Sequence, residues 1–403
     1  MPGLDVWIGA RRVGAITYLG GDRSVFAFDD AYADDPRRPT LSLVFKSAAG
    51  GLLREVRPTR ARAHPYFSNL LPEGPLRDYL AKRAGVNPTR ELHLLAMLGD
   101  DLPGAVVLTV QEEAPLPRDA EPRRFYGGGE PTALRFSLAG VQLKFSAAEK
   151  AQGGLTIPAH GVGGDWIVKL PSSRFNGVSE NEFSMMTLAA AIGIEVPQVR
   201  LLSLEDIEGL PEDIGRLKGA AYAVSRFDRS PEGERIHIED FAQVFGVFPE
   251  AKYQRASYRN IGQVLWRETG EPGYAEFVRR LVFSALIGNA DMHLKNWSLI
   301  YRDGRTPSLA PAYDLLSTIA YLPDDNAALK VARSKAWTDF DADELAALAD
   351  GSGAPQRLTL RLARETVDAF RSAWASEAAH LPMGDDVRQV VEAQLDRVPI
   401  ARG

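Results

Sequence analysis

One stretch decides how this chain is interpreted: Gly288-Asn289-Ala290-Asp291-Met292-His293-Leu294-Lys295-Asn296-Trp297-Ser298. Residues 277–287, just before it, carry apolar side chains at helical spacing, and Gly288 suits a helix stop. Residues 297–301, which overlap its end, have the composition of a short strand. Asp291 and Asn296 are therefore expected on a polar loop between a buried helix and a strand. A second aspartate, Asp314, follows downstream.

This pattern meets the needs of phosphoryl transfer. One aspartate orients or deprotonates the acceptor hydroxyl, while an asparagine and a further aspartate hold magnesium. Four residues separate Asp291 from Asn296, the spacing found in the catalytic loop of protein kinases. His293 or Lys295 could supply positive charge to the transferring group. The pair alone is weak, because such spacing arises roughly once by chance in a chain of this length, and an Asx-rich turn would look the same.

Length and composition limit the classes of protein to which this chain can belong. The chain has 403 residues, 45% of them hydrophobic and 25% charged, which predicts a soluble globular protein of two or three domains. A net charge of −6 argues against nucleic-acid binding by the chain as a whole. No apolar run approaches a membrane span, and the first residues lack a secretory signal pattern, so a cytoplasmic location is expected. The absence of cysteine excludes disulfides and thiol chemistry, and the scattered histidines show no metal-ligand spacing.

The first hundred residues predict a β-rich beginning. Segments 4–8, 13–18, 24–28 and 41–45 are short, rich in β-formers and separated by turn residues, as in a small antiparallel sheet. Helical patterns occupy much of 66–99, and a strand follows at 105–110. The next residues are rich in Pro and Gly and predict a linker. The resulting domain prediction is 1–112, a linker at 113–131, an ATP-binding region at 132–229 and a helical lobe at 230–403.

Two features upstream of the loop suit an ATP site. Residues 135–145 predict a strand–turn–strand in which a glycine lets backbone N–H groups approach phosphate, although a plain hairpin gives the same pattern. Lys169 sits in the apolar strand 166–170, where a bare ammonium is costly to bury. It therefore contacts nucleotide phosphates or guards an edge strand.

Residues 179–192 predict a helix in which Glu182 has two possible roles. Its spacing directly supports a capping box with Ser179, whereas a role as the partner of Lys169 depends on the fold. The strand at 220–225 leads to Phe227, which stacks on adenine or belongs to the core. Residues 236–240 are expected to begin a helix, and from about 240 onward the chain reads as mainly helical, with amphipathic helices at 355–379 and 386–398.

Taken in order, these features resemble one family, the HipA toxin-type serine/threonine kinases of bacteria. The stretches that carry the resemblance are Phe-Ser-Asn-Leu-Leu-Pro-Glu-Gly (67–74), Arg-Phe-Ser-Leu-Ala-Gly-Val-Gln-Leu-Lys (135–144), Ile-Val-Lys-Leu-Pro (167–171), Glu-Asn-Glu-Phe (180–183), Ser-Arg-Phe-Asp-Arg (225–229), Asn-Ala-Asp-Met-His-Leu-Lys-Asn (289–296) and Pro-Ala-Tyr-Asp-Leu-Leu (311–316). The resemblance implies an α+β fold with a HipA-type N-terminal β-rich subdomain. A protein-kinase-like, two-lobed core with a mainly helical C-terminal lobe would follow.

The resemblance also implies residue roles. Asp291 matches the catalytic aspartate and His293 the catalytic-loop histidine. Asn296 and Asp314 match the magnesium ligands. The implied ATP-binding residues are Lys169, Gly140, Val141, Gln142, Lys144, Ser225, Phe227 and Glu239. One departure is that Asn289-Ala290-Asp291 replaces the kinase His-Arg-Asp triplet, which leaves the support of Asp291 unknown.

Regulation and partners follow from the same resemblance. Ser137 falls on the serine that family members autophosphorylate, a modification that expels the Gly-containing loop and silences the kinase. The family implies a small HipB-like helix-turn-helix antitoxin, which would supply any contact with operator DNA. It also implies an aminoacyl-tRNA synthetase as the substrate class, with ATP and Mg²⁺ as cofactors and persistence as the outcome. The alternatives are a small-molecule phosphotransferase and a catalytically inactive co-repressor scaffold.

Overall fold

The computed structural model describes residues 2–402 apart from 21–22, 61, 112–115, 117–143, 151–153, 158–163, 211–216 and 325. Nearly all of the predicted linker lies outside the described residues, as do Ser137, Gly140, Val141 and Gln142. The chain forms two compact units. The first comprises residues 1–141, 228–250 and 301–306, and the second comprises 142–227, 251–300 and 307–403. Two short segments of the predicted helical lobe therefore belong to the first unit.

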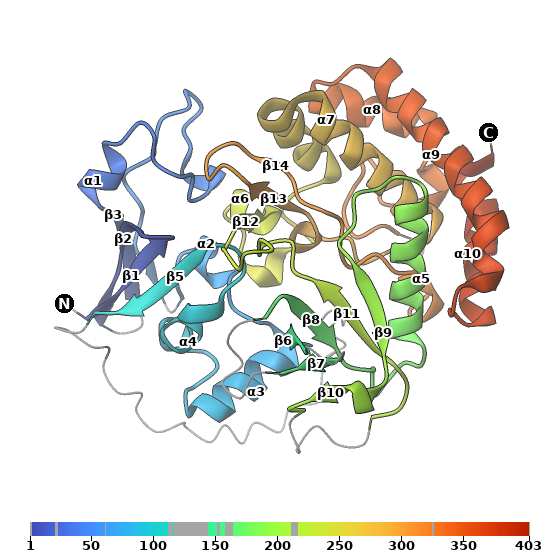
Figure 1. The fold of residues 1–403 in the computed structure, drawn as a ribbon. Coiled ribbons are helices and arrows are strands. Elements are labelled where there is room, and N and C mark those ends of the chain that lie inside the picture. The colour runs from blue at the N-terminus through green and yellow to red at the C-terminus, as the bar shows by residue number, and fades with distance from the viewer. Residues whose placement is uncertain are drawn as a thin grey trace, which may run out of the picture. The chain divides into compact units, whose positions relative to one another are not determined.

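The first unit is built on a five-stranded sheet of order β4-β3-β2-β1-β5 (Figure 1). Its strands are β1 (Gly3–Ile8), β2 (Arg11–Gly20), β3 (Arg23–Phe28), β4 (Thr59–Arg60) and β5 (Val106–Val110). All neighbouring pairs in this sheet are antiparallel. Leu4 and Val6 on one face of β1 are fully buried, as the alternating pattern predicts. The predicted β-rich beginning is confirmed.

The first unit also contains short helices. They are α1 (Asp30–Ala33), α2 (Pro65–Ser68), α3 (Gly74–Ala84), α4 (Glu91–Leu98) and α6 (Phe241–Val244). The predicted strand at 41–45 is wrong, because Leu43–Phe45 forms a 3₁₀ helix. Ser42 explains the difference, since its hydroxyl accepts a hydrogen bond from Val44 N at 3.2 Å and caps that turn.

The helix expected to begin at residues 236–240 is also wrong. These residues form the strand β12 (His237–Asp240), and α6 begins only after it. Asp240 and Gln243 make a capping box at the start of α6, which ends the strand. His237 and Glu239 are both buried on the same face of β12, a placement that requires the two-residue period of a strand.

Glu239 is part of a buried hydrogen-bond network in this unit. Its carboxylate accepts hydrogen bonds from the Ser42 hydroxyl, the Tyr301 hydroxyl and the Leu43 N–H. His237 Nε2 donates to Leu41 O at 2.8 Å. The polar groups of β12 therefore hold residues 41–43 in place, and burial raises the pKa of Glu239 to about 7.

His237 makes the stability of the first unit sensitive to acid. Burial lowers its pKa to about 4, below the usual 6.5. A depressed folded-state pKa gives stability that is complete above pH 6.5 and is lost as pH falls toward 4. We expect wild type to lose up to about 3 kcal/mol of unfolding free energy over this range from His237 alone. Urea midpoints of wild type and His237→Gln at pH 7 and pH 4.5 measure the effect, and equal pH slopes in both would contradict it.

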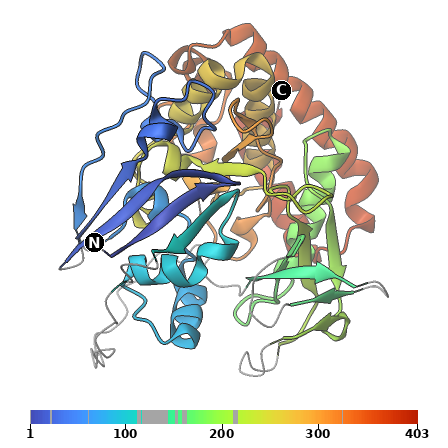
Figure 2. The same ribbon diagram turned by 60° about the vertical axis from the view of Figure 1, so that its left-hand side comes forward.

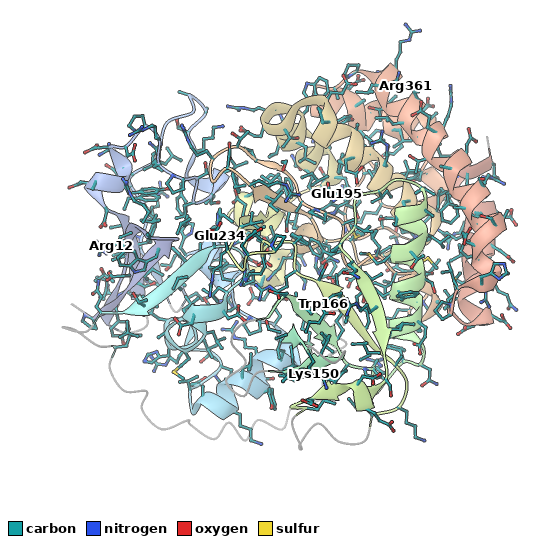
Figure 3. All side chains as sticks on the ribbon, in the orientation of Figure 1. Arg12, Lys150, Trp166, Glu195, Glu234 and Arg361 are labelled. Carbon is teal, nitrogen blue, oxygen red and sulfur yellow. The ribbon has the colours of Figure 1, made fainter. Side chains whose placement is uncertain are left out.

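The second unit begins with a six-stranded sheet of order β10-β7-β6-β8-β11-β9. Its strands are β6 (Lys144–Glu149), β7 (Leu155–Thr156), β8 (Trp166–Lys169), β9 (Val199–Leu202), β10 (Ile207–Glu208) and β11 (Ala221–Ser225). Trp166, labelled in Figure 3, marks the start of β8, near the middle of this sheet. The helix α5 (Val178–Ala191) packs on β9 and β11 (Figure 2).

The rest of the second unit is mainly helical. Its helices are α7 (Tyr258–Leu286), α8 (Ala342–Ser352), α9 (Gln356–Glu377) and α10 (Asp385–Arg397). The helices predicted at 355–379 and 386–398 are confirmed as α9 and α10. Strands β13 (Ser298–Tyr301) and β14 (Ser308–Leu309) form a hairpin after α7. Among the described residues, no helix is both long and apolar enough to cross a membrane.

Candidate active site

The loop quoted at the outset begins where α7 ends. Gly288 has a φ of +65°, and a Cβ at this position would collide with the Ile319 side chain. A left-handed backbone and this close approach both require glycine. Asn289 N then donates to Ser284 O at 2.8 Å, which closes the helix end. The predicted stop at Gly288 is therefore confirmed.

Two asparagine side chains hold the loop in shape. Asn289 Oδ1 accepts from Asp291 N at 3.1 Å, while its Nδ2 donates to Asp314 O at 3.1 Å. Asn296 Nδ2 donates to Asp291 O at 2.9 Å. Asn289 is 0% exposed. The backbones at Asp291, Asn296 and Asp314 are thus joined by side-chain amides, and Asn289 provides the support that the missing His-Arg-Asp triplet left open.

Tyr253 contacts the loop from the segment before α7. Its hydroxyl donates to Asp291 Oδ1, and its ring lies edge-on to His293 with centroids 4.9 Å apart. His293 is 2% exposed, so its ring is packed inside the loop. A phenol that donates to a carboxylate favours the ionised form of that carboxylate.

Lys169 lies between two carboxylates. Its ammonium group is 2.6 Å from Glu182 Oε1 on α5, and it also contacts Asp314 Oδ1. The exposed fractions of these side chains are 12% for Lys169, 2% for Glu182 and 21% for Asp314. A buried lysine in an apolar strand is stable only with such partners. The edge-strand interpretation of Lys169 is wrong, because β8 has neighbours on both sides.

The two possible roles of Glu182 are resolved by the start of α5. The N-cap of this helix is Gly177, and it makes no side-chain cap hydrogen bond. Glu182 instead pairs with Lys169. The capping box with Ser179 is therefore absent, and the ion pair is present.

The charges of this cluster are strongly coupled. Burial would raise the pKa of Asp314, but the positive charges of Lys169 and Lys144 outweigh it and lower the pKa to about 2. Burial would lower the pKa of Lys169, but Asp314 and Glu182 outweigh it and the pKa rises. Burial raises the pKa of Glu182. Asp314 is thus an anion and Lys169 a cation throughout the neutral range.

Asp314 also has an unusual backbone. Its φ of +55° is the only positive value at a non-glycine residue in the part of the chain that the structure describes. Such a conformation costs about 1–3 kcal/mol and persists where the surroundings over-determine it. Here the Asn289 amide holds the Asp314 carbonyl and Lys169 holds its carboxylate.

The remaining predicted residues fall into two groups. Lys144 pairs in register with Lys169 across β6 and β8, and Ser225 ends β11. The Phe227 ring lies 5.7 Å from that of Tyr313, the residue before Asp314. These three residues belong to the second unit, as does the cluster around Lys169. Glu239 belongs to the first unit, where its carboxylate is occupied by the network described above, so we leave it out of the candidate site.

Four residues of the site were missed by sequence reasoning. Asn289, Asn181 and Thr318 support the loop or the Asp314 segment, and Tyr253 contacts Asp291. Asn289 stands in the loop itself, and Asn181 stands in the Glu-Asn-Glu-Phe stretch, so their positions offered a signal. Tyr253 and Thr318 lie outside any recognisable pattern.

Comparison with known protein families identifies two domains in this chain. The family model of the HipA N-terminal domain matches residues 4–109, and that of the HipA-like C-terminal domain matches residues 136–374. A chain in the structure of the Shewanella oneidensis HipA–HipB toxin–antitoxin system with its operator DNA superimposes with a TM-score of 0.75. It is 22% identical and covers 99% of this chain and 96% of its own length, so the two share a fold.

Relatives in sequence carry kinase names. Y4dM of Sinorhizobium fredii, provisionally named a kinase, is 54% identical over 402 residues, which cover 99% of this chain and 98% of the relative. The serine/threonine-protein kinase toxin HipA of Shewanella oneidensis is 28% identical over 351 residues, 76% of either chain. The matched domains, their order and the shared fold lead to one conclusion: this chain belongs to the HipA family, and its α+β architecture is a HipA N-terminal domain followed by a kinase-like HipA C-terminal domain.

Proposed function

We propose that this protein is an ATP- and Mg²⁺-dependent serine/threonine protein kinase. The observation that carries the proposal is the cluster in which Lys169 contacts Glu182 and Asp314, and Asn289 joins Asp314 to Asp291. A strand lysine, a helix glutamate, a metal-binding aspartate and a catalytic aspartate are the parts that a kinase assembles. The kinase names of its relatives support the same function.

In this mechanism each side chain has a defined task. Lys169 is held ready to meet the nucleotide phosphates, and Glu182 fixes its position from α5. Asp291 accepts the acceptor hydroxyl proton or orients that hydroxyl for attack. Ser225 and Phe227 would contact the adenine of the nucleotide. Most of the acceleration then comes from positioning and electrostatics.

The residues present fit magnesium. Asp314 is anionic because its pKa is about 2. The Asn296 Nδ2 atom donates to Asp291 O, which leaves Oδ1 as the acceptor of that amide. Mg²⁺ in phosphoryl-transfer sites is commonly held by one or two carboxylates together with phosphate oxygens. Asn296 and Asp314 would hold the ion, which supplies charge neutralisation for the phosphates when bound.

The biological setting we propose is a toxin–antitoxin pair. The Shewanella structure contains HipB and operator DNA with its HipA. By analogy, this chain would bind a HipB-like helix-turn-helix antitoxin in the cytoplasm, reach operator DNA only through it, and phosphorylate an aminoacyl-tRNA synthetase. Autophosphorylation at Ser137 would switch it off. Transfer to metabolites alone would favour a small-molecule phosphotransferase, and ATP binding without transfer would favour a co-repressor scaffold.

Intact mass tests the function directly. Wild type, Ser137→Ala and Asp291→Asn are weighed before and after incubation with Mg-ATP. We expect wild type alone to gain one phosphoryl group, mapped to Ser137. Unmodified wild type that gains none would refute autophosphorylation, and if it also failed to phosphorylate any protein substrate we would adopt the scaffold alternative.

Tyr253 gives a finer test of Asp291. Phenylalanine at this position keeps the ring against His293 but removes the donor to Asp291 Oδ1. Without this bond the Asp291 carboxylate is held less firmly toward the acceptor hydroxyl, so turnover should fall about tenfold or more. The acid limb of the pH–rate profile should move to higher pH, because ionised Asp291 loses a donor. An unchanged profile would show that Tyr253 has no influence on the catalytic carboxylate.

A further inference from the structure

Asn181 lies on α5, and its side-chain amide bonds to residues of the segment that follows Asp314. Its Oδ1 accepts from Ser317 N at 3.0 Å, and its Nδ2 donates to Ser317 O at 3.0 Å. The same Nδ2 lies 3.3 Å from the Tyr321 hydroxyl. Asn181 and Ser317 are both 0% exposed. One amide thus satisfies both backbone groups of a buried residue, as a neighbouring strand would.

These contacts lie beside the charged cluster of Lys169, Glu182 and Asp314, and both sets of contacts join α5 to the same segment. Asn181 precedes Glu182 on α5, and Ser317 follows Asp314 by three residues. Lys169 contacts both Glu182 and Asp314. Helix α5 therefore holds the 314–318 segment at two points. Asn181 bonds both backbone groups of Ser317, a contact that we call the clamp, and Glu182 pairs with Lys169, which in turn contacts Asp314.

The same segment is also attached to the catalytic loop. Thr318 Oγ1 accepts from Ala290 N at 2.7 Å and lies 3.3 Å from Gly288 O. Asn289 reaches the Asp314 carbonyl. Residues 314–318 are thus a bridge whose one side is fixed to α5 and whose other side is fixed to the loop that carries Asp291.

We propose that Asn181 is a positioning residue that keeps the 314–318 segment in register with α5, so that Lys169, Asp314 and Asp291 are aligned together. The proposal deepens the kinase function proposed above and rests on it. Asparagine suits the task because it offers a donor and an acceptor on one planar group without charge. Aspartate has the same shape but, when ionised, repels Ser317 O.

Two variants at Asn181 test the proposal against a matched control. Asn69 in the first unit is also buried, and its Nδ2 donates to Pro65 O and Val247 O at 2.8 and 2.7 Å. Asn181→Ala and Asn69→Ala should both lower the urea midpoint. Only Asn181→Ala should lower kcat, by roughly ten- to a hundredfold, because small misplacements near the reacting groups are costly. Equal kcat in the two variants would overturn the proposal.

The aspartate variant supplies a readout that a purely structural role would not move. A buried aspartate takes up a proton more readily, and the protonated acid can donate to Ser317 O as the amide does. The ratio of Asn181→Asp turnover to wild-type turnover should therefore rise as pH falls from about 8 to 6. A flat ratio would count against the clamp, and this arm remains decisive if Asn181→Ala does not fold.

Hydrogen exchange separates failure of the inference from failure of the function. The Ser317 amide donates to Asn181 Oδ1, so its exchange should accelerate in Asn181→Ala, which removes the acceptor, but not in Asn69→Ala. This measurement needs no catalysis. Wild type that transfers no phosphate defeats the proposed function and with it the positioning role, whatever the exchange shows. Active wild type with unchanged Ser317 exchange in Asn181→Ala defeats the inference alone.

Discussion

Replacing Asp291 with asparagine should lower phosphoryl transfer by about 10²–10⁴-fold, the usual contribution of a general base. Asparagine has the shape of aspartate and keeps an oxygen for the Tyr253 hydroxyl, but it cannot accept a proton. The bonds from Asn289 and Asn296 reach only the backbone of Asp291, so the loop should keep its form. The measurement is single-turnover transfer from Mg-ATP, alongside a urea melt.

Asp303 provides the control for this substitution. Its carboxylate accepts from Arg305 N and Thr306 N at 2.8 and 2.7 Å in an exposed turn of the first unit. Asp303→Asn changes the net charge equally and should leave transfer at the wild-type rate. Transfer by Asp291→Asn within a few-fold of wild type would remove Asp291 from the mechanism, whereas an equal loss in both variants would point to a general effect of charge.

Replacing Lys169 with methionine should abolish transfer and also destabilise the fold. Lys169 is the cation that contacts both Glu182 and Asp314, and its ammonium group lies 5.5 Å from the centre of the Tyr222 ring. Removing one partner of a buried ion pair costs about 3–5 kcal/mol, because the other partner remains as an uncompensated charge. The loss should grow as pH rises, because a carboxyl with a raised pKa, such as Glu182, destabilises the fold once it must ionise.

A double variant separates the two effects. Lys169→Met with Glu182→Gln removes the buried charge of Glu182 together with its partner, so much of the lost stability should return. Transfer should stay absent, because the contact that we propose between Lys169 and the nucleotide phosphates is still missing. Urea midpoints and ATP-dependent transfer are compared for wild type, both single variants and the double variant. Recovered transfer in the double variant would show that Lys169 has only a structural role.

Local patterns predicted the parts of this site that depend on neighbours in the chain. The stop at Gly288 follows from helical spacing followed by glycine, and the structure has it at φ +65°. The apolar strand around Lys169 is present as β8. The same local logic failed at 41–45 and at 236–240. There a serine cap and the burial of two polar side chains decided the conformation.

Contacts between distant residues were beyond the sequence pattern. The sequence spacing favoured the capping role of Glu182. The structure instead has Gly177 as the N-cap of α5 and places the Glu182 carboxylate beside Lys169. The contact of Lys169 with Asp314 joins residues 145 positions apart, and that of Tyr253 with Asp291 joins residues 38 apart. Neither separation is a period of a helix or a strand, so no local sequence pattern predicts either contact.

By itself the sequence determined the family, the order of its domains and the identity of the charged residues, because short stretches with fixed spacing encode them. The tertiary structure alone decided which of those charges meet. It placed Lys169 between two carboxylates and gave Asp314 its left-handed backbone. In the folded protein the Asn181 amide links the 314–318 segment to α5, and the Asn289 amide links that segment to the loop. The physical reason is that a buried charge or amide is stable only beside its partner, and folding supplies that partner from elsewhere in the chain.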